Sequence, residues 1–222
     1  MNNTKKPWES GTDFERNRFP SFDNNDAFKS SFLTNILFLS KRGMSRAPLA
    51  REIMSELLEQ THLFGRVRTS SRGVTEAYDQ CPIDARMSKF SSKLGFFLNG
   101  YSRFATIPDI SNADIIITLD QESESFIRQN KSFVKGITRP IGIYLCNGSS
   151  PYVADPYERN DDEDIDVHYE EIASLIKNGC SKLFTQLPSL ISWWMIVFAH
   201  SIPQIRSFWF KYQIEQVDLI HF

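Results

Sequence analysis

The sequence has few cysteines and almost no excess of charge. Its 222 residues carry a formal net charge of −2, so no overall positive field attracts nucleic acid, and we expect no nucleic-acid partner. The three cysteines are widely spaced and odd in number: Cys81, Cys146 and Cys180. They match neither a disulfide framework nor a zinc-binding pattern. We therefore predict an intracellular, reducing compartment and no bound metal or other cofactor.

The sequence also lacks a long uninterrupted apolar run. The most apolar stretch, residues 187–202, contains Pro188 and His200 and is shorter than the roughly 20 residues that a membrane-spanning helix needs. Residues 1–19 are polar and charged and lack the apolar stretch of a secretory signal. We therefore expect a soluble protein that does not span a membrane.

Short apolar runs alternate along the chain with segments of helical periodicity. Strands are expected at 35–39, 65–69, 114–119 and 140–145. Helices are expected from Pro48, near 82–84, at 122–129 and at 169–187. This alternation predicts an α/β fold in which helices cover both faces of a four-stranded parallel sheet.

The length fits one domain of about 150 residues with appendages. Residues 1–33 are rich in polar residues and are interpreted as an N-terminal extension, and 34–187 as the domain. Residues 188–222 form an aromatic-rich C-terminal extension, in which eight of 35 residues are aromatic. An acidic run at 158–166 is interpreted as a solvated loop.

The first predicted strand runs directly into a basic loop that precedes a helix. The loop consists of Ser40, Lys41, Arg42, Gly43, Met44, Ser45 and Arg46. A helix N-terminus attracts anions through its free N–H groups and its dipole. An arginine six positions after Ser40 can fold back and bind a phosphate with two hydrogen bonds. We predict an anion-binding site formed by residues 41–46, although an ordinary turn with surface cations fits the spacing equally well.

Four motifs in order resemble those of the low-molecular-weight protein tyrosine phosphatase family. The family's loop pattern, C-x-G-N-x-C-R-S-P, resembles residues 40–48. Its later segments resemble 81–86 (CPIDAR), 114–120 (DIIITLD) and 155–157 (DPY). The resemblance covers roughly 150 residues and implies that family's fold.

The resemblance also implies a role for three positions. In the family the loop cysteine attacks phosphorus, the arginine binds the phosphoryl oxygens, and the aspartate of the DPY motif protonates the leaving phenol. These positions correspond to Ser40, Arg46 and Asp155. A thiolate near a helix N-terminus is a strong nucleophile, whereas a serine hydroxyl without an adjacent base is a very poor one.

The loop departs from the family pattern at five positions, which are Ser40, Arg42, Gly43, Ser45 and Ala47. A deliberate exchange of one cysteine for serine predicts a single change, so these departures favour natural loss of the nucleophile. The other interpretation is an active phosphatase represented by a Cys-to-Ser form. A further alternative is that Arg46 forms an internal ion pair and Asp155 only caps a turn.

We therefore predict a catalytically inactive phosphatase-like module that binds phosphate or a phosphorylated protein, or that acts as a scaffold. A purely structural subunit of a larger assembly is the third interpretation. The aromatic density of residues 188–222 is typical of a protein–protein anchor or of peripheral contact with a membrane surface. Folding of this segment onto the domain itself is an equal alternative.

Overall fold

The computed structural model describes residues 33–145, 150–158 and 164–201, with side chains as far as 191. Four strands form one parallel sheet in the order β2-β1-β3-β4. They are β1 (Thr34–Ser40), β2 (Val67–Gly73), β3 (Ile115–Thr118) and β4 (Ile137–Pro140). The predicted four-stranded parallel sheet is confirmed.

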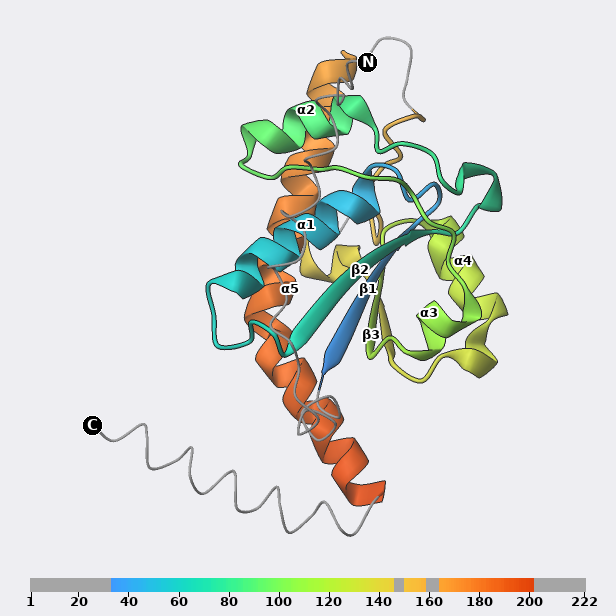
Figure 1. Ribbon diagram of the computed structural model, residues 1–222, viewed down its shortest axis with the longest axis vertical. Helices are drawn as coiled ribbons and strands as arrows, with labels where there is room; N and C mark the ends of the chain where they lie inside the picture. The colour runs from blue at the N-terminus through green and yellow to red at the C-terminus, as the bar shows by residue number, and fades with distance from the viewer. Residues whose placement is uncertain (1–32, 146–149, 159–163, 202–222) are drawn as a thin grey trace, which may run out of the picture. The chain divides into compact units, whose positions relative to one another are not determined.

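Helices cover both faces of this sheet. Figure 1 shows α1, α2 and α5 on one side of the strands and α3 and α4 on the other. Their bounds are α1 Arg46–Glu59, α2 Ala85–Lys93, α3 Ile107–Ser111, α4 Gln121–Gln129 and α5 Ile165–Ser201. Three short 3₁₀ helices complete the described chain: η3 Glu76–Tyr78, η4 Lys131–Phe133 and η5 Ile141–Tyr144.

The central strand β1 is buried on both faces, which explains its continuous apolar run. Successive side chains of a strand point to opposite faces. Ile36 and Phe38 accordingly belong to the core formed with α1 and α5. Leu37 and Leu39 belong to the smaller core that includes Ile110 of α3 and Ile127 of α4. The strand thus holds the loop that follows it between two packed layers.

Two predicted strands are wrong in position. The strand expected at 65–69 is β2, which begins at Val67 and ends at Gly73. It is a polar edge strand, so it lacks the apolar run that marks a buried one. The run at 140–145 is η5 for most of its length. Its residues Ile141 and Tyr144 are fully buried, so the apolar signal reflected burial and not strand structure.

The last helix is longer than predicted. The segment expected at 169–187 is part of α5, which continues through Pro188 to Ser201 without a break. A proline within a helix costs about 3 kcal/mol. Leu187, Leu190 and Ile191 pack on the core on both sides of this proline, and this burial offsets the cost. The predicted boundary at 187 therefore falls within a continuous helix.

Some predictions concern residues that the structure does not describe. Residues 1–32 and 202–222 lie outside the described residues, as do 159–163 of the acidic run. No helix in the described part of the chain is long and apolar enough to cross a membrane.

Candidate anion-binding site

The basic loop connects the end of β1 to the start of α1. Ser40 is the last residue of the strand and Arg46 the first of the helix. Gly43 has a φ of +68°, a left-handed conformation that glycine adopts without strain and that asparagine also tolerates. A Cβ atom at Gly43 would lie 2.5 Å from the backbone nitrogen of Gly73. Glycine here lets the loop pack closely against the end of β2.

Ser40, at the predicted nucleophile position, is 2 % exposed. Its Oγ accepts a hydrogen bond from the Gly43 N–H at 3.2 Å. Among the described residues no carboxylate or imidazole lies within hydrogen-bonding distance of this hydroxyl. The described residues 33–145, 150–158 and 164–191 therefore place no base beside the Ser40 hydroxyl.

Arg46 lies beneath the loop and is only 3 % exposed. Its Nη1 donates to the backbone oxygen of Val153 at 2.8 Å. Its Nη2 lies 2.8 Å from Asp120 Oδ2 and 3.1 Å from Asp155 Oδ2. The guanidinium is thus fixed by a backbone carbonyl and two carboxylates, and the predicted internal ion pair of Arg46 is confirmed.

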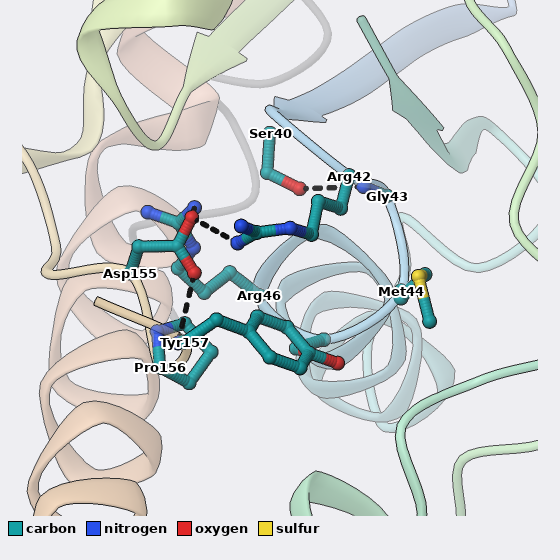
Figure 2. Close-up of a pocket in the computed structure, with 9 residues that line it drawn as sticks. Ser40, Arg42, Gly43, Met44, Arg46, Asp155, Pro156 and Tyr157 are labelled. Atoms are coloured by element: carbon teal, nitrogen blue, oxygen red, sulfur yellow. Dashed lines mark hydrogen bonds and ion pairs between the residues drawn. The ribbon is translucent and has the colours of Figure 1, made fainter. Parts of the chain in front are cut away.

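Arg42 occupies the centre of the site. Its side chain points inward toward Asp155 and lies alongside the ring of Tyr157 (Figure 2). Arg42 Nη1 lies 2.6 Å from Asp155 Oδ2. The guanidinium carbon lies 4.5 Å from the ring centroid of Tyr157 and 5.3 Å from that of Tyr78. Two aromatic faces and one carboxylate therefore hold this cation.

Asp155 joins the two arginines. One oxygen, Oδ2, contacts both Arg42 and Arg46. The other oxygen, Oδ1, accepts a hydrogen bond from the Tyr157 N–H at 3.1 Å (Figure 2). The carboxylate therefore also caps the turn that follows it, as one sequence interpretation predicted. Its side chain is 7 % exposed, so this ion pair is largely shielded from solvent.

The other predicted loop residues have different surroundings. Lys41 Nζ lies 2.8 Å from Glu122 and 2.6 Å from Glu158, and these two hydrogen bonds raise the pKa of Lys41. Met44 lines the pocket but its side chain points away from Asp155 (Figure 2). Of the cations predicted to bind an anion, Arg42 and Arg46 both contact Asp155 Oδ2. Lys41 is instead paired with two glutamates.

Ser45 anchors the loop to two helices through Asp84. The Ser45 hydroxyl donates to Asp84 Oδ2 at 2.9 Å, and the Tyr169 hydroxyl donates to the same oxygen at 2.8 Å. Asp84 Oδ1 caps α2 by accepting from the backbone N–H groups of Arg86 and Met87. Burial acts to raise the pKa of Asp84, but hydrogen bonds to its ionised form, led by Tyr157 and Tyr169, lower it overall.

This network predicts a pH-dependent contribution of Asp84 to stability. The pKa of Asp84 is lower in the folded protein than the value of about 3.9 in an unfolded chain. Its contribution is therefore present above pH ~4 and is lost as the pH falls through the lowered pKa. We expect Asp84→Asn to reduce the free energy of unfolding at pH 7 by about 1–3 kcal/mol and by less at pH ~3.

Urea unfolding of the wild type and of Asp84→Asn at both pH values measures this difference. Ser45→Ala serves as the control, because it removes one donor and keeps the carboxylate. An Asp84→Asn effect that is equal at the two pH values would contradict the assignment.

The pocket over the loop is almost completely filled. Its lining residues are Ser40, Arg42, Gly43, Met44, Ser45, Arg46, Asp155, Pro156 and Tyr157. The remaining cavity volume is about 10 Å³, close to the minimum for one water molecule. A phosphate group cannot enter while Arg42 and Asp155 keep these positions. In the described part of the chain, no group of three or more His, Cys, Asp or Glu side chains is arranged to hold a metal ion.

Sequence reasoning did not assign roles to several residues of this site. Asp120 follows β3, the neighbour of β1, and accepts a hydrogen bond from the Lys41 N–H at 2.7 Å. The carboxyl ends of parallel strands lie at one edge of a sheet, and this rule identifies Asp120 from sequence. Tyr78 and Glu122 carry no comparable signal in the sequence.

Comparison with known proteins agrees with this architecture. The family model described as "Low molecular weight phosphotyrosine protein phosphatase" matches residues 35–190. The low molecular weight protein-tyrosine-phosphatase YfkJ of Bacillus subtilis is 24% identical over 158 residues, which cover 70% of this chain and 96% of that protein.

Solved structures share the fold. The crystal structure of YfkJ has a TM-score of 0.62 at 23% identity and covers 71% of this chain and 96% of YfkJ. A protein tyrosine phosphatase from Entamoeba histolytica has a TM-score of 0.62 at 18% identity, with 70% and 97% covered. A Cys-to-Ser mutant of YwlE, the arginine phosphatase, has a TM-score of 0.57 at 20% identity, with 70% and 96% covered, and its active-site serine is phosphorylated.

Proposed function

Because the chain belongs to the low-molecular-weight protein tyrosine phosphatase family, we propose that it is a catalytically inactive member, which has kept the anion-binding arginine and lost the hydrolytic reaction. The observation that carries this proposal is the state of Ser40. The residue lies at the nucleophile position, and within the described part of the chain its hydroxyl is hydrogen-bonded to the Gly43 N–H alone. A serine hydroxyl stays protonated at neutral pH unless a base is adjacent.

A second obstacle to catalysis supports the proposal. The aspartate of the DPY motif must protonate the leaving group if it is to act as the family's general acid. Here Asp155 forms ion pairs with Arg42 at 2.6 Å and with Arg46 at 3.1 Å. Both ion pairs hold the carboxylate inside the pocket. Asp155 is therefore not positioned to protonate a leaving group while these ion pairs are in place.

The intact fold gives such a protein a role in binding. The loop still places two guanidinium groups at the end of β1, which suits recognition of a phosphorylated protein. The aromatic-rich residues 188–222 are a candidate segment for anchoring a protein partner. We assign this chain the function of a phosphatase-like binding or scaffolding module.

An active phosphatase in a Cys-to-Ser form is the competing proposal. The phosphorylated serine of the YwlE mutant is a precedent for a serine that receives a phosphoryl group in this fold. A single Cys-to-Ser exchange does not account for Arg42, however, which fills the pocket where the family pattern has glycine. The filled pocket favours the inactive member.

The test is hydrolysis of a phosphotyrosine peptide by the purified chain. We expect no turnover above that of a Ser40→Ala variant, which removes only the hydroxyl oxygen. The rate is measured as release of inorganic phosphate under multiple-turnover conditions, with the concentrations of enzyme and substrate varied. Catalytic hydrolysis that is present in the wild type and absent in Ser40→Ala would refute the proposal.

A further inference from the structure

One carboxylate oxygen in the pocket has the surroundings of a bound oxyanion. Asp155 Oδ2 lies 2.6 Å from Arg42 Nη1 and 3.1 Å from Arg46 Nη2. We propose, on the basis of the proposed function, that Asp155 is an internal ligand of the loop. A phosphate dianion binds between Arg42 and Arg46 by displacing the Asp155 carboxylate. Arg42 is then a second anion-binding residue, at a position where the family pattern has glycine.

The charges of the site favour this exchange. Arg46 forms an ion pair with Asp120 as well as with Asp155. Arg42 forms its ion pair with Asp155. When Asp155 leaves, Arg46 keeps one carboxylate, whereas the Arg42 guanidinium loses its own. The vacated position then carries one uncompensated positive charge, and a dianion with several acceptor oxygens can bridge both guanidinium groups.

Arg42 has two aromatic contacts in addition to its ion pair with Asp155. Its guanidinium lies against Tyr157 and Tyr78, at 4.5 Å and 5.3 Å from the ring centroids. Its side chain is 17% exposed, so little solvent competes for it. Two aromatic contacts fix the cation before any ligand arrives, which reduces the ordering cost of binding.

The displacement requires only a local movement. Val153 is anchored on both sides, because its N–H donates to Leu119 O at 3.0 Å and its carbonyl accepts from Arg46 at 2.8 Å. Asp155 lies two residues beyond this anchor, and its Oδ1 holds only the turn N–H of Tyr157. The carboxylate can therefore leave the pocket while Asp120 and the Val153 carbonyl still hold Arg46. The space available with Asp155 inside, about 10 Å³, makes its departure a condition of binding.

The experiment compares phosphate affinity in variants that remove the internal ligand. Isothermal titration of inorganic phosphate is measured for the wild type, Asp155→Asn and Asp155→Ala. We expect both variants to bind phosphate at least about tenfold more tightly than the wild type, since each loses a charge-assisted competitor. Adding Arg42→Met to Asp155→Asn is expected to reverse most of the gain. A phosphotyrosine peptide and a phosphoserine peptide, titrated in parallel, distinguish a protein-borne phosphate from the free ion.

Glu158→Gln is the matched control. It removes one negative charge from the same loop, where Glu158 contacts Lys41 at 2.6 Å. It keeps the ion pairs of both arginines with Asp155, so the affinity for phosphate is expected to change less than about threefold. Equal affinity in the wild type and both Asp155 variants, with folding verified by thermal unfolding, would overturn the inference. So would a gain that survives Arg42→Met. Neither result bears on hydrolysis, so the proposed loss of catalysis is tested separately.

Discussion

The double variant Ser40→Cys/Arg42→Gly is expected to hydrolyse phosphotyrosine at least about 10²-fold faster than Ser40→Cys alone. The cysteine supplies a thiol at a helix N-terminus, where its pKa is lowered and a thiolate is available. This change alone leaves the Arg42–Asp155 ion pair in place, which competes with the substrate and restrains the carboxylate that would protonate the leaving phenol. Replacing Arg42 with the glycine of the family pattern removes the shorter of the two ion pairs of Asp155 and opens the pocket.

The choice of substrate makes this prediction specific. An aryl phosphate with an acidic leaving group needs little protonation of that group during hydrolysis. The tyrosine hydroxyl, in contrast, has a pKa of about 10 and needs a proton to leave. Ser40→Cys alone is therefore expected to act on the activated ester, and the second substitution is expected to benefit phosphotyrosine most. Initial rates on both substrates for the two single variants and the double variant measure the coupling.

Arg42→Gly without the cysteine is the control and is expected to show no turnover. The result that contradicts the assignment is equal activity of Ser40→Cys with and without Arg42→Gly on phosphotyrosine. Arg42 would then not restrain the general acid. If neither form turned over, Ser40 would not be the only lost catalytic element, and the loop itself would be unable to support the reaction.

Removal of the Arg46 guanidinium has the second large expected effect. Arg46→Met is expected to reduce the free energy of unfolding by about 3–5 kcal/mol. The side chain is 4% exposed, and its carboxylate partners Asp120 and Asp155 are each 7% exposed. Methionine keeps much of the apolar stem, so the loss comes mainly from two buried carboxylates left without this cation. Chemical denaturation at pH 7 measures the change.

Arg51→Met is the matched control on the same helix. Arg51 forms an ion pair with Glu52 at 3.4 Å, and its side chain is 30% exposed, so its loss is expected to cost less than about 1 kcal/mol. Adding Asp120→Asn to Arg46→Met removes a buried carboxylate that has lost its cation and is expected to recover part of the stability. Equal effects of Arg46→Met and Arg51→Met would show that the buried network does not stabilise the fold.

The two effects connect stability with function. Arg46 is an anion-binding residue in the family pattern, yet here it also ties the first helix to the ends of two other segments through Asp120 and Val153. We therefore expect this arginine to stabilise the fold independently of any role in hydrolysis. Its persistence therefore does not by itself indicate catalysis.

Local patterns in the sequence determined the core of this fold. The continuous apolar run of β1 and the helical spacing that follows it are local features, so they predicted the strand, the loop and the start of α1. The helix expected near 82–84 begins at Ala85, directly after its N-cap Asp84. The position of Ser40 at the end of β1 followed from the same pattern.

The edge strands were less predictable because burial, which produces an apolar run, is incomplete there. The polar strand β2 was placed too early, and the apolar residues after β4 belong to a buried 3₁₀ helix. Gly142 explains this placement, because a Cβ there would lie 2.4 Å from Pro151. The close approach of a distant segment, and not the local pattern, decided the conformation.

The state of the site was decided by tertiary structure alone. The sequence identified Arg42 as a departure from a family glycine and Asp155 as the general acid position. It did not show that these residues, 113 positions apart, form an ion pair at 2.6 Å. A hydrogen bond depends on where the fold brings the two side chains, and sequence spacing carries no information on that distance. The sequence determined that serine stands at the position of the family's cysteine, and the folded chain determined that its own carboxylate lies between two arginines.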